Sequence, residues 1–270
     1  MTTKAKKDCI YNLGLALSGG GTRGFAHLGA IQAMYEYGLK PDVVSGTSAG
    51  SIVGAMICSG KEPHECLEFF LKKKLFDFTR LTISKKGLLS FDQFAVRLQK
   101  FLKVSSFEEL QIPLIITATD IDHAQSVHFS SGELIQRILA SCSIPVVFVP
   151  TTIDGIQYVD GGLFMNLPVR PIRKLCEKVI AIEINSFENS LKIENMLHVA
   201  ERSFHLGLAS NTAIDRKMAD LLIAPENMLH YSMLDLKAAE KIFNLGYEAA
   251  KERLKDFSLQ QLHHPSSSLL

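Results

Sequence analysis

Short apolar runs alternate with longer amphipathic stretches along the chain. An apolar run over residues 13–17 predicts a buried strand, and apolar residues at helical spacing predict a helix over residues 25–37. Further strands are predicted at residues 42–45, 114–119, 126–129, 157–159, 178–184 and 221–224. Helices are predicted at residues 51–58, 132–141, 190–218 and 232–255, and residues 62–110 are expected to be mostly helical. This alternation favours a three-layer α/β/α fold around a central, mainly parallel sheet.

Composition narrows the class of protein. The 270 residues are 47% hydrophobic and 21% charged, and the formal net charge is +1. That charge argues against a nucleic-acid binder that depends on a basic surface. The five scattered cysteines fit no metal-ligand spacing and indicate free thiols in a reducing compartment. Since no apolar run reaches the ~20 residues of a membrane helix, we expect a cytoplasmic protein that contacts membranes at most peripherally.

The five residues Gly46-Thr-Ser-Ala-Gly50 lie between a predicted strand and an apolar helix. A serine on such a sharp turn needs small neighbours such as Gly46 and Gly50, because the two backbones come close. Its hydroxyl stands clear of the sheet, and the following helix presents amides to a developing negative charge. Ser48 is therefore the candidate nucleophile, although this pattern alone is weak in a chain with 18 glycines.

A glycine-rich loop, Gly19-Gly-Gly-Thr-Arg-Gly24, also lies between a predicted strand and a helix. Its spacing matches dinucleotide-binding loops, which need an acidic residue at the end of the second strand. Asp42 instead lies at the start of that strand, so nucleotide binding is a less favoured alternative. Unobstructed amides suit an oxyanion hole equally well, and the turns after two parallel strands open on the same sheet edge. The candidate oxyanion residues are Gly19, Gly20, Gly21, Thr22, Arg23 and Gly24.

The candidate base is a carboxylate. A triad would want a histidine late in the chain on a tight loop after a strand, and none of the late histidines lies on one. These are His198, His205, His230, His263 and His264, and His27 lies on a predicted helix face. Asp160 follows the extended residues 157–159 and precedes Gly161 and Gly162, although an ordinary Asp-Gly turn has the same pattern. An aspartate with a solution pKa of about 3.9 is a poor base, so the fold would have to desolvate it.

These motifs, in this order, resemble the three motifs of the patatin-like phospholipases. Ser143-Ile-Pro145, with Phe148 and Pro150, and Thr117-Ala-Thr-Asp120 resemble two supporting segments of that family. The resemblance covers residues 11–175 and implies an α/β catalytic region. Residues 176–270 are then expected to form an extension that packs on the same domain.

The resemblance also implies a chemistry. Ser48 would be the nucleophile and Asp160 the proton acceptor of a Ser-Asp dyad, and the amides of Gly20 and Gly21 would bind the oxyanion. The reaction would hydrolyse lipid acyl esters through an acyl-enzyme, without a metal or organic cofactor. A catalytically silent scaffold of the same fold is the main alternative. Head group, acyl length and oligomeric state stay open.

Two further clusters have simpler explanations. Asp120, Asp122, His123 and His128 fit no zinc or calcium spacing, and a turn at a strand end explains them without a metal. Residues 69–86 are aromatic and basic, with six cationic side chains against Asp77 alone over residues 72–86. We favour an amphipathic core helix there, and transient contact with an anionic lipid surface is the second hypothesis.

Overall fold

The computed structural model describes residues 9–71, 92–185, 196–231, 236–255 and 257. They form an eight-stranded sheet of order β5-β6-β3-β2-β1-β7-β8, with β4 also paired to β3. The strands are β1 (Tyr11–Leu17), β2 (Val43–Thr47), β3 (Leu114–Asp120), β4 (Gln125–Phe129), β5 (Thr151–Ile153), β6 (Ile156–Asp160), β7 (Cys176–Ile182) and β8 (Leu221–Ile223). Strands β1, β2, β3, β7 and β8 pair in parallel, whereas β4 and β6 each pair antiparallel to β3. The α/β fold with a mainly parallel sheet is confirmed.

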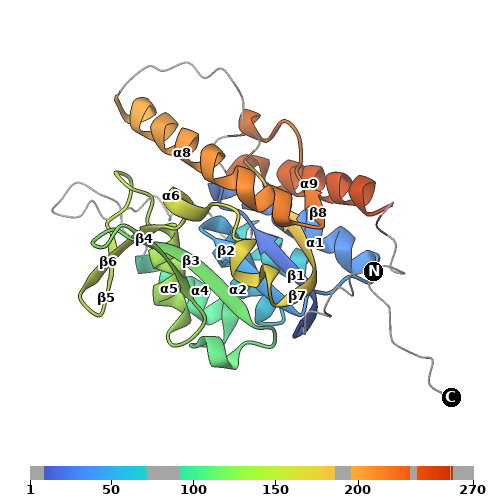
Figure 1. Ribbon diagram of the computed structural model, residues 1–270. Helices are drawn as coiled ribbons and strands as arrows, with labels where there is room; N and C mark the ends of the chain where they lie inside the picture. The colour runs from blue at the N-terminus through green and yellow to red at the C-terminus, as the bar shows by residue number, and fades with distance from the viewer. Residues whose placement is uncertain (1–8, 72–91, 186–195, 232–235, 256, 258–270) are drawn as a thin grey trace, which may run out of the picture.

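Helices cover both faces of this sheet (Figure 1). They are α1 (Phe25–Glu36), α2 (Ala49–Cys58), α3 (Pro63–Leu71), α4 (Asp92–Leu102), α5 (Leu134–Cys142), α6 (Gly162–Met165), α7 (Arg170–Arg173), α8 (Met196–Met218) and α9 (Ala239–Leu254). Alternate side chains of β1 enter different layers, as the pleat of a strand requires. Leu15 and Leu17 join the larger core with α1, α2 and α9, whereas Ala16 joins a second core with residues 167–172.

The predicted elements are largely present, with shifted ends. The expectation for residues 62–110 is only partly correct, because α4 ends at Leu102 and Lys103 leaves the helix with a φ of 61°. Residues 72–91, and with them most of the basic segment 69–86, lie outside the described residues. Phe69 and Phe70 lie in α3 and pack in T-shaped contact with each other. Within the described part of the chain, no helix is long and apolar enough to cross a membrane.

Helices α1 and α9 are in direct backbone contact. A Cβ atom at Gly29 of α1 would lie 1.9 Å from the carbonyl oxygen of Phe243, and one at Gly246 of α9 would lie 2.0 Å from that of Ala26. These glycines therefore let the two helices approach more closely than any larger residue would allow. Since α1 follows the glycine-rich loop directly, α9 supports the element on which that loop rests.

We predict that Gly29→Ala lowers the free energy of unfolding by about 1–3 kcal/mol, because the new methyl group overpacks the α1–α9 contact. Gly207→Ala is the matched control, because nothing lies within 4 Å of a Cβ atom at this position in α8. There the exchange should be neutral or stabilise by roughly 0.5–1 kcal/mol. Urea denaturation of both variants measures the difference, and equal midpoints would contradict the prediction.

Candidate active site

The register of β3 brings the two candidate dyad residues together. Strand β4 pairs with residues 116–120 of β3 and occupies one edge. On the opposite edge β2 pairs as far as Thr117, and β6 pairs from Ala118 onward. Because β2 runs parallel and β6 antiparallel to β3, these strands point at each other along one edge. Ser48 follows the last residue of β2, and Asp160 is the last residue of β6.

Ser48 lies on a strained turn between β2 and α2. Its φ of 52° and ψ of −121° are rare for a residue with a side chain, and such conformations concentrate at functional sites. A Cβ atom at Gly50 would lie 2.2 Å from the carbonyl oxygen of Leu17, and one at Gly46 would lie 2.4 Å from that of Gly50. The small residues are therefore required by backbone contact, which is the geometry expected for a nucleophile elbow.

Two neighbouring serines hold this turn. The backbone amide of Ser48 donates to Ser141 Oγ at 2.8 Å, and Ser141 Oγ donates to the carbonyl of Thr117 at 2.7 Å. Ser51 Oγ donates to the carbonyl of Ser48 at 2.7 Å. Both peptide groups of Ser48 are thus fixed. Ser141 was not among the residues predicted from the sequence, where the one indication of its role is its position two residues before Ser143 of the Ser-Ile-Pro segment.

Asp160 is buried beside Ser48. Asp160 is 2% exposed, and its carboxylate accepts a hydrogen bond from the amide of Gly162 at 2.8 Å, while the Ser48 side chain lies close enough to affect its pKa. Burial raises the pKa of this carboxyl to about 6, and the Ser48 side chain and the Gly162 amide oppose that rise. The carboxylate is therefore a stronger base than an aspartate in water, which is what the sequence argument required of the fold.

The glycine-rich loop lies against the same turn, because β1 and β2 pair in parallel up to Leu17 and Gly46. A Cβ atom at Gly19 would lie 3.1 Å from that of Ser48, and one at Gly24 would lie 3.1 Å from that of Ala49. Residues Gly21–Gly24 form a 3-10 turn, η1, which contains Thr22 and Arg23. The structure thus brings the two ends of the predicted loop, Gly19 and Gly24, beside the elbow.

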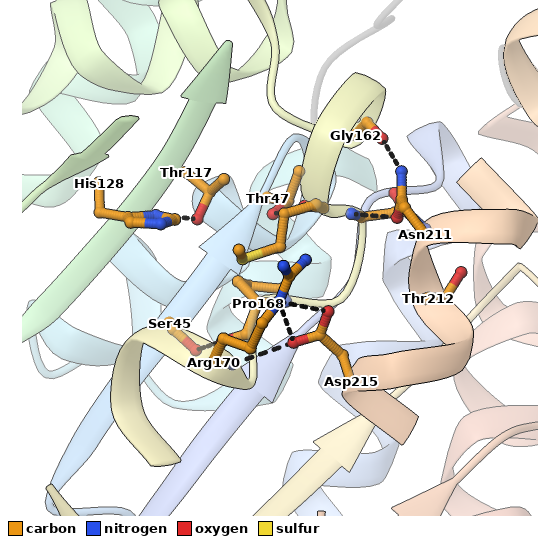
Figure 2. Close-up of polar contacts among 12 residues, drawn as sticks. Ser45, Thr47, Thr117, His128, Gly162, Pro168, Arg170, Asn211, Thr212 and Asp215 are labelled. Atoms are coloured by element: carbon orange, nitrogen blue, oxygen red, sulfur yellow. Dashed lines mark hydrogen bonds and ion pairs between the residues drawn. The ribbon is translucent and has the colours of Figure 1, made fainter. Parts of the chain in front are cut away.

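Strand β2 also holds the segment after Asp160. Its side chains at alternate positions point to the face opposite α2. Thr47 Oγ1 donates to the carbonyl of Met165 at 2.9 Å, and Ser45 Oγ donates to that of Pro168 at 2.5 Å (Figure 2). The strand that ends next to Ser48 therefore anchors the segment that follows Asp160.

Helix α8 fixes the same segment from outside (Figure 2). Asn211 donates from Nδ2 to the carbonyl of Gly162 at 2.8 Å and accepts at Oδ1 from the amide of Asn166 at 3.0 Å. Arg170 donates from Nε to both carboxylate oxygens of Asp215, which is buried. Gly162 and its neighbour Gly161 are therefore held in place beside Asp160. Sequence reasoning missed these α8 contacts, because no local pattern connects them to the motif.

The acidic and histidine residues after β3 have local partners. His123 Nδ1 lies 2.9 Å from Asp120 Oδ2, and His128 Nδ1 lies 3.0 Å from Thr117 Oγ1. Asp122 accepts from the amide of Gln157 at 2.8 Å. Among the residues that the structure describes, no three His, Cys, Asp or Glu side chains converge as metal ligands would.

The fold and its three loops define the class of protein. The family model of the patatin-like phospholipases matches residues 15–173, and the chain belongs to this family. Among its relatives, an NTE family protein of Mycobacterium tuberculosis is 33% identical over 177 residues, which cover 64% of this chain and 49% of the relative. Lysophospholipase NTE1 of Saccharomyces cerevisiae is 27% identical over 272 residues, which cover 87% of this chain and 16% of the yeast protein.

A solved structure supports the fold. VipD from Legionella pneumophila matches with a TM-score of 0.56 at 14% identity, covering 94% of this chain and 71% of that one. The chain spans about half the length of the mycobacterial relative. Family membership supports a lipid hydrolase, and the family model ends at residue 173, before α8 and α9.

We predict that Asp160→Asn stabilises the protein at pH 8. A carboxyl whose pKa is about 6 in the folded state and 3.8 otherwise binds more protons when folded, so wild-type stability falls as pH rises through this window. The amide carries no charge, and the variant should therefore be more stable by about 1–3 kcal/mol at pH 8. Urea denaturation at pH 8 and pH 4 tests this, and the difference should shrink at pH 4.

The control for this prediction is Asp154→Asn in the exposed turn between β5 and β6. The same chemical change should alter stability little there, because surface substitutions have small effects. A stabilisation of Asp160→Asn that persists unchanged at pH 4, or that Asp154→Asn reproduces, would contradict the assigned burial of charge.

Proposed function

We propose that the protein is a serine lipid acyl hydrolase in which Ser48 and Asp160 form a catalytic dyad. The observation that carries the proposal is the placement of Ser48, on a strained turn at the end of β2, beside a buried carboxylate whose pKa is raised to about 6. Family membership and a relative named lysophospholipase support a phospholipase- or lysophospholipase-like esterase. We keep the basic segment 69–86 as the candidate for peripheral contact with a lipid surface.

In the first half of the reaction, Ser48 Oγ attacks the ester carbonyl carbon as its proton moves to Asp160. The carbonyl oxygen becomes an oxyanion, and amides of the glycine-rich loop donate to it. When the tetrahedral intermediate collapses, the bond to the alcohol breaks, and the leaving oxygen takes the proton from Asp160. The product of this half is an acyl-enzyme and a free alcohol.

In the second half, water attacks the acyl-enzyme and passes a proton to Asp160. The second tetrahedral intermediate expels Ser48 Oγ, which recovers its proton, and the fatty acid leaves. Each step uses only the dyad and the loop amides, so the scheme requires no metal. A base with a pKa near 6 lies closer to neutral pH than a solvated aspartate, and this raises the efficiency of proton transfer.

The arrangement weighs against the alternatives. A catalytically silent scaffold of the same fold would have no need for a strained nucleophile turn beside a desolvated carboxylate. A nucleotide-binding protein would need its acidic residue at the end of β2, where Ser48 lies. The carboxylate of Asp42 instead accepts hydrogen bonds from the backbone amides of Asn12 and Leu13, at the other end of the sheet.

We predict that a fluorophosphonate probe labels the wild-type protein and fails to label Ser48→Ala, because only an activated serine attacks the phosphorus. Hydrolysis of a soluble acyl ester should be lost in the same variant. Ser59→Ala, at the far end of α2, removes a hydroxyl that donates to the carbonyl of Met56, its one partner among the described residues, and should leave both readouts unchanged. A folded wild-type protein that resists the probe would favour the scaffold alternative.

We also predict that kcat/KM falls as pH drops through about 6, because protonated Asp160 cannot accept the serine proton. Below that pH the decrease should approach about tenfold per unit. Asp160→Asn should lower activity by roughly 10²–10⁴-fold and remove the acid limb of the profile. An acid limb that survives in this variant would assign the base to another residue.

A further inference from the structure

The side chain of Asn185 connects the two ends of the glycine-rich loop. Asn185 lies shortly after β7, beyond residue 173, where the family match ends. Its Nδ2 donates to the carbonyl of Gly19 at 3.0 Å, and its Oδ1 accepts from Arg23 Nη1 at 3.1 Å. Because one partner is an acceptor and the other a donor, the orientation of the amide is fixed.

The first of these contacts sets the direction of a candidate oxyanion donor. The carbonyl of Gly19 and the amide N–H of Gly20 belong to one planar, trans peptide group, so they point in opposite directions. When Asn185 binds the carbonyl, it also orients the Gly20 N–H. A Cβ atom at Gly20 would lie 3.1 Å from Asn185 Oδ1 and 2.7 Å from Ile184 Cδ1, so this peptide packs directly on the end of β7.

The preceding peptide group is held in a similar way. The carbonyl of Ser18 lies 2.8 Å from Nε2 of His27, and the amide of Gly19 donates to the carbonyl of Asn166 at 3.1 Å. His27 is fully buried, and burial lowers its pKa to about 4, so the imidazole is neutral and its Nε2 carries the proton. Along the loop, Gly20 is the first residue whose backbone amide has no acceptor among the described contacts of the protein.

Arg23 completes the support. Its side chain is buried, and its Nε donates to the carbonyl of Tyr231 at 3.0 Å. Asn185 and Tyr231 thus hold the second end of the loop from segments that lie far along the chain. A loop fixed at both ends keeps its amides in place before the substrate arrives, which is the condition for strong stabilisation of an oxyanion.

We propose that Asn185 is a positioning residue for the oxyanion hole: its hydrogen bond to the carbonyl of Gly19 aims the Gly20 N–H at the oxyanion. The proposal rests on the proposed hydrolase function. It assigns to a residue outside the family match a role in the transition state, while Asn185 itself does not contact the substrate. The contact with Arg23 anchors the loop and is secondary.

Asn185→Asp separates the two contacts. A carboxylate of the same size still accepts from Arg23, but it cannot donate to the Gly19 carbonyl and repels it. We expect kcat for a soluble acyl ester to fall by about 10–100-fold, somewhat less than on loss of a whole oxyanion donor, with KM within roughly threefold of wild type. In Asn185→Leu, which loses both contacts, kcat should decrease by at least the same factor.

The acid limb of the pH profile distinguishes a loss of loop orientation from a general disturbance of the active site. None of the described contacts joins Asn185 to Asp160, and Asn185→Leu adds no charge, so the apparent pKa of this limb should stay at the wild-type value in Asn185→Leu. Asn244→Asp makes the same chemical change at an exposed position of α9 and should leave kcat, KM and the pH profile unchanged. Thermal unfolding confirms that each variant is folded, and Asn185→Asp carries the test if Asn185→Leu does not fold.

The outcomes separate this proposal from the function on which it rests. An active wild type with an Asn185→Asp variant of undiminished kcat would overturn the positioning role alone. The same holds if the neutral variant Asn185→Leu moves the acid limb, because the change would then have disturbed the dyad. A folded wild type that neither hydrolyses esters nor reacts with the fluorophosphonate overturns the hydrolase function, and the positioning role with it.

Discussion

The buried charge of Asp160 is the constraint on which the rest of the site depends. Water around this carboxylate would stabilise its charge and return its pKa toward about 3.9, which would make it a weak base. A neighbouring lysine or arginine would have the same effect. The groups that oppose the effect of burial are instead neutral, the Ser48 side chain and the Gly162 amide. The site therefore has to be built from backbone amides and small side chains, which is why glycine and serine dominate its loops.

Such a site needs support from parts of the chain that carry none of the proposed chemistry. Asn211 and Asp215 of α8 hold the segment that follows Asp160, and Tyr231 and Asn185 hold the glycine-rich loop. The backbones of α9 and α1 are in contact, and α1 is the helix that follows that loop. The region beyond the family match is consequently part of the architecture of the site, although its sequence carries no recognisable motif.

The sequence predicted the features that depend on local pattern. Small residues around Ser48 and Asp160, and the alternation of strands and helices, reflect constraints within a few neighbouring positions. The antiparallel approach of β6 to β3 was not predicted, because strand pairing is decided by distant contacts. Ser141 and Asn185 were not predicted for the same reason, because their hydrogen-bond partners, Ser48 and Gly19, lie 93 and 166 positions away in the sequence. A serine or asparagine with a distant partner looks like any other polar residue.

The register of β6 on β3 has a consequence for how the dyad could fail. Side chains alternate between the faces of a sheet, so a slip of one residue would carry the carboxylate of Asp160 to the opposite layer. A slip of two would keep its face but displace it by roughly 7 Å, beyond the reach of a serine hydroxyl. The alignment of acid and alcohol is in this sense a discrete quantity. The register of β6 on β3 changes only in whole residues, so small shifts between the correct and the displaced arrangement are not available to the paired strands.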